Sequence, residues 1–147
     1  MGGHPYWYIV PYQSNLQAAL DELRQREFKA GRYNPVMPFL NFPLGPDAPS
    51  PGARHRTIAD ALEASDADGT RSILDIERIA ESPEYCTASP LDPELLEEFY
   101  GTTRPTREMV EENMDFLDEL ERGQAAYIIL YSGNTPTEVL FVGYSFD

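Results

Sequence analysis

Nucleophilic catalysis needs a nucleophile, a base that takes its proton, and a group that orients the base. The chain offers one cysteine, Cys86, and two histidines, His4 and His55, for the first two roles. Glu84 lies two residues before Cys86, and a neighbouring acid raises the pKa of a thiol instead of activating it. The G-x-S-x-G turn that presents a serine nucleophile is absent from the sequence. We therefore expect a protein that is not an enzyme.

If the protein were an enzyme or a small-anion-binding domain, its site would be the segment Arg54-His55-Arg56. This segment directly precedes a helix expected to start at Thr57, and helix N-termini attract anions. The two arginines would bind the anion and His55 would transfer the proton. The favoured interpretation is a solvated basic loop that offsets part of the acidic charge elsewhere.

Metal-binding patterns are weak in this chain. One cysteine and two distant histidines cannot supply the ligands of a structural zinc site. Asp66, Asp68, Gly69 and Asp75 resemble a fragment of a calcium loop, but an Asp-Gly turn is the favoured interpretation. Removal of the first methionine would leave a Gly-Gly-His terminus, in which His4 binds Cu(II) or Ni(II) adventitiously. The glycines form no phosphate-binding motif, so we expect no cofactor.

The charge of the chain is strongly negative and unevenly distributed. There are 25 acidic and 11 basic residues, which give a formal charge of −14. Residues 1–56 hold four acids and six bases, so residues 57–147 hold the other 21 acids with five bases. A nucleic-acid binder would need the opposite sign, whereas an acidic side suits a basic protein partner.

Two helices are expected to carry much of this acidic charge. Asp92-Pro93 and Gly101 predict a helix over 93–100, and Thr106 starts a second helix over 106–121. Uncompensated carboxylates are costly to bury, so these acids should face solvent. The acids expected to be exposed are Glu94, Glu97, Glu98, Glu111, Glu112, Asp115, Asp118 and Glu119, and all except Glu94 are candidate binding residues.

The first half of the chain predicts two strands and two helices. Residues 6–12 are aromatic and β-branched and end near a proline, which predicts a strand at a sheet edge. Ser14 as a cap and Gly31 as a stop predict a helix between them. A short helix is expected from Thr57, and a strand over 71–79.

Residues 33–53 contain six prolines among several large apolar side chains. Proline excludes both a helix and a central strand from this segment. The apolar content is too high for a solvated linker, so we expect an extended arm packed over the body. Phe39 and Phe42 should then be at least partly buried.

The last 24 residues predict a β-hairpin over 125–146, with strands that are apolar on both faces. Such a hairpin belongs at the centre of a sheet or at a subunit contact. One face should lie under the helices. The second face should be covered by the arm or by a second copy of the chain in a homodimer.

These elements together predict one α+β domain over 1–147, with a Pro-rich arm at about 33–53. We expect one mostly antiparallel sheet of about four strands, with helices packed on it and a C-terminal β-hairpin. No apolar run approaches the roughly 18 residues of a membrane span, and no secretory signal pattern is visible. With a single cysteine, these features favour a cytoplasmic protein that binds no membrane.

The sequence favours a small acidic cytosolic binding protein that recognises another macromolecule, with a basic protein as the expected partner. An antitoxin-like or immunity-like inhibitor of a basic toxin or nuclease is one concrete version, by analogy of charge and size. Two alternatives stay open: an enzyme or anion binder at Arg54-His55-Arg56, and a structural domain that self-associates through its hairpin.

Overall fold

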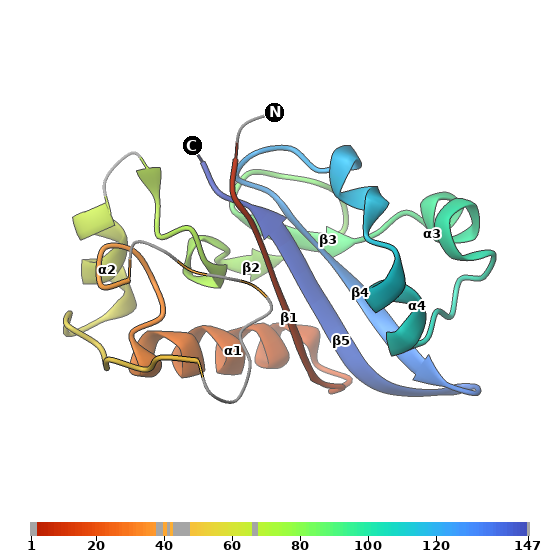
Figure 1. Cartoon of the computed structure of the whole chain (residues 1–147), viewed down its shortest axis with the longest axis horizontal. Helices are drawn as coiled ribbons and strands as arrows, with labels where there is room; N and C mark the ends of the chain where they lie inside the picture. The colour runs from red at the N-terminus through yellow and green to blue at the C-terminus, as the bar shows by residue number, and fades with distance from the viewer. Residues whose placement is uncertain (1–2, 38–39, 41, 43–47, 66–67, 147) are drawn as a thin grey trace.

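The computed structural model describes residues 3–37, 40, 42, 48–65 and 68–146. Within them, a five-stranded mixed sheet carries helices on both faces, which confirms the α+β class (Figure 1). The strands are β1 (Pro5–Pro11), β2 (Arg78–Ile79), β3 (Thr87–Pro90), β4 (Ala125–Ser132) and β5 (Thr135–Tyr144). The helices are α1 (Leu16–Ala30), α2 (Ile58–Ser65), α3 (Pro93–Tyr100) and α4 (Arg107–Glu112), with 3-10 turns η2 (Ile73–Asp75) and η3 (Asp115–Glu119). None of these described helices combines the length and apolar character needed to cross a lipid bilayer.

The sheet differs from the expected one in strand number and direction. Its strand order is β1-β5-β4-β3-β2, in which β5 runs antiparallel to both of its neighbours. Strand β3 instead lies parallel to β4 and to β2. The prediction of about four mostly antiparallel strands is therefore wrong in detail. The reason is that β2 has two residues and β3 has four, too few for the two-residue alternation that reveals a strand.

The strand expected over 71–79 is mostly a buried turn. Its first part forms η2, and only its last two residues pair as β2. The Ser72 hydroxyl accepts the amide hydrogen of Leu74 at 3.3 Å and caps η2. Every residue from Ser72 to Ile76 is buried, so the apolar run serves a turn inside the core instead of a strand.

Strands β4 and β5 form the expected C-terminal hairpin, and they lie at the centre of the sheet as predicted. On one face, Phe141 packs in a cluster with Leu20 of α1. On the other face, Leu140 packs with Leu96 of α3 and Phe116 of η3. Helices therefore pack on both faces, so the expectation that helices would cover only one face is corrected. Helix α1 follows β1 onto one face, whereas the elements between β3 and β4 pack on the other.

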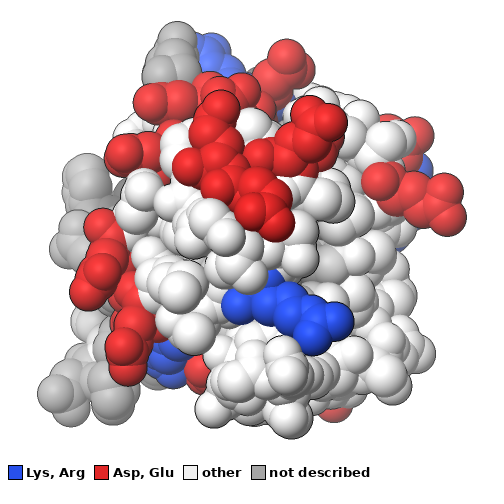
Figure 2. Space-filling view, turned by 90° about the vertical axis from the view of Figure 1, so that its right-hand side faces the viewer, with Lys and Arg blue, Asp and Glu red and all other residues white. Residues whose placement is uncertain are grey.

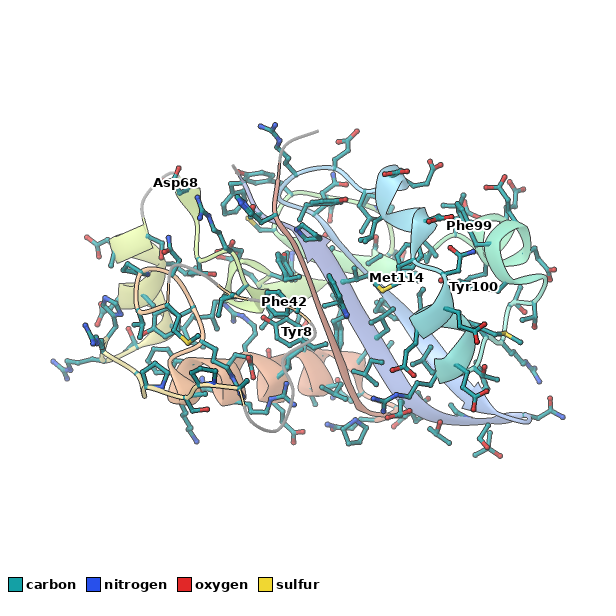
Figure 3. The ribbon with its side chains drawn as sticks, in the orientation of Figure 1. Tyr8, Phe42, Asp68, Phe99, Tyr100 and Met114 are labelled. Carbon is teal, nitrogen blue, oxygen red and sulfur yellow. The ribbon has the colours of Figure 1, made fainter. Side chains whose placement is uncertain are left out.

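The arm adds a smaller piece to the α1 face. The half-buried ring of Phe42 lies edge-on to Tyr8, with ring centroids 5.2 Å apart (Figure 3). This contact confirms the partial burial predicted for Phe42, whereas Phe39 lies outside the described residues. Near the far end of the arm, the amide of Gly52 donates to the carbonyl of Ala30 at 2.8 Å. The arm is therefore packed against the body at Phe42 and Gly52, whereas residues 49–51 are exposed.

Strand β1 lies at the sheet edge, as predicted, and the positions of its prolines suit that place. The Tyr12 amide donates to the Thr137 carbonyl at 3.0 Å, so even-numbered residues direct their backbone groups to β5. Pro5 and Pro11 are at odd positions, where the backbone points away from the sheet. Prolines at these positions cost no hydrogen bond to β5, because an N–H there would point away from it.

Helix α1 begins one residue later than expected. Its cap is Asn15, whose side-chain oxygen accepts the Ala18 amide at 3.0 Å, and not Ser14. Its predicted stop is confirmed, because Gly31 adopts a left-handed conformation with φ of 75°. The boundaries of this helix thus follow from side chains next to it in sequence.

Candidate functional site

Helix α3 has the boundaries that its sequence predicts. The Asp92 side chain caps it by accepting the amide hydrogen of Glu94 at 2.8 Å, and Pro93 takes the first helical position. Gly101 ends the helix with φ of 71°. Leu96 is buried in the cluster that covers one face of the sheet, which fixes the rotation of α3.

The second acidic helix is shorter than predicted. The segment expected as one helix over 106–121 forms α4, a break at Asn113, and then η3. Asn113 has an extended backbone, and its side-chain oxygen accepts the amide of Asp115 at 2.9 Å, which competes with helix continuation. Its carbonyl accepts the hydroxyl hydrogen of Tyr100 at 2.6 Å and so joins the break to α3.

The break keeps the apolar residues on the sheet side. Val110 of α4 and Phe116 of η3 are both buried in the same cluster as Leu96. Figure 3 shows Phe99, Tyr100 and Met114 between α3 and the sheet side of η3, and Tyr100 and Met114 pack partly buried against this cluster. A continuous helix would have turned some of these side chains away from the sheet.

The carboxylates predicted to face solvent do so. We call this set the acidic face: Glu94, Glu97, Glu98, Glu111, Glu112, Asp115, Asp118 and Glu119, each of which is exposed. Figure 2 views the molecule from the side of α3 and α4, and acidic groups gather over its upper part and left edge. Uncharged surface and a short Lys or Arg stretch lie below them. The acidic charge is therefore available to a partner.

Few basic side chains offset this charge. From α3 to η3 the chain carries nine acids and two arginines. Arg107 contacts Glu138 at 2.8 Å and Glu111 at 3.4 Å. Arg104 lies with its guanidinium 5.7 Å from the centre of the Tyr131 ring. Both arginines contact their own chain, and a net negative charge remains on this side.

The acids of the face also act on two partly buried phenols. Burial, with a smaller contribution from the Asp115 charge, raises the pKa of Tyr100 to about 12. Burial and the Asp118 charge likewise raise the pKa of Tyr144. Tyr100 therefore stays protonated at physiological pH and keeps its hydrogen bond to the end of α4.

The segment Arg54-His55-Arg56 is assembled ahead of α2, but its histidine is committed to the body. The fully buried Tyr33 places its hydroxyl 2.9 Å from Nδ1 of His55, and this hydroxyl accepts the Arg54 amide at 3.3 Å. Arg54 and Arg56 are exposed. The hydroxyl thus has its own hydrogen free to donate to Nδ1, and only Nε2 of His55 is left for a ligand.

Each of the two weak metal patterns includes residues outside the described part of the chain, namely Gly2 and Asp66. The backbone amide of His4 donates to the Ser145 hydroxyl at 2.9 Å, and residues 1–2 lie outside the described part. Of the calcium-like fragment, Asp68 is exposed whereas Asp75 is buried. Among the described residues, no group of three or more histidine, cysteine or acidic side chains could hold a metal ion.

Two buried acids were missed at the level of the sequence. Glu27 is 0% exposed, and its Oε2 accepts from Arg26 at 2.9 Å and from Arg32 at 3.0 Å. Its spacing of four residues from the buried Leu23 was a usable signal, because i and i+4 share a helix face. Asp75 is 2% exposed within an apolar run. Nothing in that run indicates whether the Asp75 carboxyl group lies in the core or at the surface.

Searches of protein-family models, curated proteins and solved structures found no match to this chain.

Proposed function

We propose that this protein is a binding domain that docks a basic protein partner through its acidic face. The observation that carries the proposal is the exposure of all eight carboxylates on elements whose apolar side chains are fixed to the sheet. The charge is thereby held in one place by a packed layer and not by a loose tail. A positioned acidic surface is what electrostatic recognition of a basic surface requires.

The partner expected here carries clustered lysine or arginine side chains. Opposite charges speed the encounter of two proteins, and salt weakens this effect because the screening length is about 8 Å at physiological ionic strength. An inhibitor of a basic toxin or nuclease is the concrete version that we favour. Such an inhibitor would cover the basic surface that its target needs for its own substrate.

The test compares two variants that lose the same charge from different places. Four acids of the acidic face are replaced by their amides, and the control replaces four exposed acids of α1 and α2. The face variant is E97Q/E98Q/D115N/D118N, and the control variant is D21N/E22Q/D60N/E63Q. Each protein is immobilised and exposed to native lysate at low and physiological salt, and mass spectrometry identifies the retained proteins.

A basic protein retained by the wild type and the control, but lost from the face variant, would support the proposal. Its association rate with the purified wild type should also fall as salt rises. Equal retention by the two variants would contradict the proposal, because net charge alone would then explain the capture. Retention of an acidic partner would contradict it as well.

A further inference from the structure

Asp75 is a buried carboxyl group that is satisfied on one oxygen only. Its Oδ1 accepts the amide and the hydroxyl of Thr70, each at 2.8 Å. Its Oδ2 is buried and has no hydrogen-bond partner. The neutral acid fits such a place, but an ionised carboxylate would leave a charged oxygen without a donor.

The ring of Phe146 lies beside this unsatisfied oxygen. A Cβ built on Gly69 would lie 2.4 Å from Cδ2 of Phe146 and 2.8 Å from Oδ2 of Asp75. The ring and the oxygen therefore meet at the same glycine, whose φ of +70° also disfavours any other residue. On its other side, Phe146 packs on the exposed ring of Tyr85, with centroids 5.0 Å apart. The Phe146 ring thus packs between the glycine beside Asp75 and the Tyr85 ring.

Phe146 lies beyond the end of the sheet. Strand β5 ends at Tyr144, and the Ser145 amide donates to the His4 carbonyl at 3.0 Å. The Ser145 hydroxyl accepts the His4 amide at 2.9 Å. The backbone is therefore fixed up to Ser145, and the half-buried Phe146 follows the last of these bonds.

Backbone strain is concentrated around the same carboxyl group. Arg71 and Cys86 have φ of 54° and 62°, which non-glycine residues seldom adopt. Arg71 follows Thr70, and Cys86 follows Tyr85. The Cys86 amide is held by the Gly123 carbonyl at 2.7 Å. Such strain persists only where the surroundings impose it, and it is frequent at switch regions.

The other ionisable groups that act on Asp75 come from three elements. They are Tyr6 of β1, Arg24 of α1, and Tyr85 and Cys86 of the β2–β3 connection. Burial raises the pKa of Asp75 to about 6, and the two Thr70 bonds, the backbone amide of Arg71 and the Arg24 charge oppose this rise without cancelling it. Burial also raises the pKa of Tyr6, so its phenol stays neutral when Asp75 titrates.

We infer that the Phe146 ring is a pH-dependent cap, which covers Asp75 while this carboxyl group is neutral and moves aside when the group ionises. Loss of the proton to solvent leaves Oδ2 charged and without a donor. Water must then reach the oxygen, and the Phe146 ring, which lies beyond the end of β5, is the part of the cover that we expect to move. At low pH the carboxyl group takes the proton back and the ring closes on Gly69.

The test places 4-fluorophenylalanine at position 146 and follows its ¹⁹F resonance from pH 4.5 to 7.5. The wild-type resonance should change environment with a midpoint near pH 6. Asp75→Asn should abolish this midpoint and leave the resonance in one environment. Asp147→Asn is the matched control, because it removes the carboxyl group next to Phe146 in sequence, and it should keep the midpoint.

A resonance that does not respond to pH, or a midpoint that survives Asp75→Asn or is lost in Asp147→Asn, would overturn the inference. A second measurement decides the matter even if Asp75→Asn fails to fold. In Phe146→Ala, a ¹³C titration of the Asp75 carboxyl group should show its proton affinity lowered by about tenfold or more, because water reaches Oδ2. An unchanged titration would show that the ring is not the cover.

Discussion

Replacing Asp75 by asparagine should remove a pH-dependent part of the free energy of unfolding. Burial raises the pKa of Asp75 from its ordinary value of 3.8 to about 6 in the folded protein. The native state therefore holds this proton more tightly than the unfolded chain does. The stability contributed by the bound proton is present below the ordinary pKa and is lost as pH rises through about 6.

The size of this effect follows from the pKa difference. One pKa unit corresponds to about 1.4 kcal/mol, so a difference of about two units gives about 3 kcal/mol. Asp75 is 2% exposed, so solvent screening does not reduce this value appreciably. Asparagine keeps an oxygen acceptor for Thr70 but cannot ionise. Part of this loss has already occurred at pH 4, so the asparagine variant should gain about 2.4 kcal/mol relative to the wild type between pH 4 and pH 7.

The assay is urea denaturation at several pH values, followed by fluorescence of Trp7, the single tryptophan. Subtracting the free energy of unfolding of one protein from that of the other cancels the contributions of the carboxylates that they share. The exposed Asp118, changed to asparagine, is the matched control for the loss of one carboxyl group. A difference for Asp75→Asn that varies by less than about 0.5 kcal/mol, or falls with pH, would refute the reasoning.

Three further outcomes follow from packing. Gly31→Ala should lower the free energy of unfolding by more than about 2 kcal/mol, because its Cβ would lie 2.3 Å from the Gly52 carbonyl oxygen. Gly101→Ala, equally left-handed but in open space, should cost about 1 kcal/mol, and equal thermal shifts for the two would contradict this account. Phe116→Ala should cost about 3–5 kcal/mol in urea denaturation, because the ring is fully buried. Val142→Lys should prevent folding, as measured by circular dichroism, and a folded variant of unchanged mass by light scattering would show that the hairpin core tolerates a charge.

Elements with local signals in the sequence were predictable. Helix α3 carries its own cap in Asp92-Pro93 and its own stop in Gly101, and its boundaries are confirmed. The hairpin strands are apolar at every position of residues 127–131, which indicated their central place before any partner strand was known. Strands β2 and β3 had no such signal. They are too short to show a period, and their parallel pairing depends on contacts that the local sequence does not encode.

Part of the candidate site was predictable for an energetic reason. A helix with many carboxylates must turn them to water, so the exposure of the acidic face followed from the cost of burial. Asp75 was not predictable in this way, because its environment is assembled from distant parts of the chain. Phe146 is 71 residues away from it, and Tyr6 is 69 residues away. Only the fold brings these groups to one place.

The acidic face and the Asp75 site belong to opposite faces of the sheet, so we expect them to act independently. Ile73 and Ile76, two residues before and one residue after Asp75, pack in the cluster under α1, whereas Leu96 and Phe116 pack under the acidic face. Charges separated by more than about 8 Å of water are largely screened at physiological salt. The face variant should therefore keep the ¹⁹F midpoint of residue 146, and Asp75→Asn should keep the captured partner. A shift of the midpoint in the face variant, or loss of the partner in Asp75→Asn, would mean that the sheet transmits the state of one site to the other.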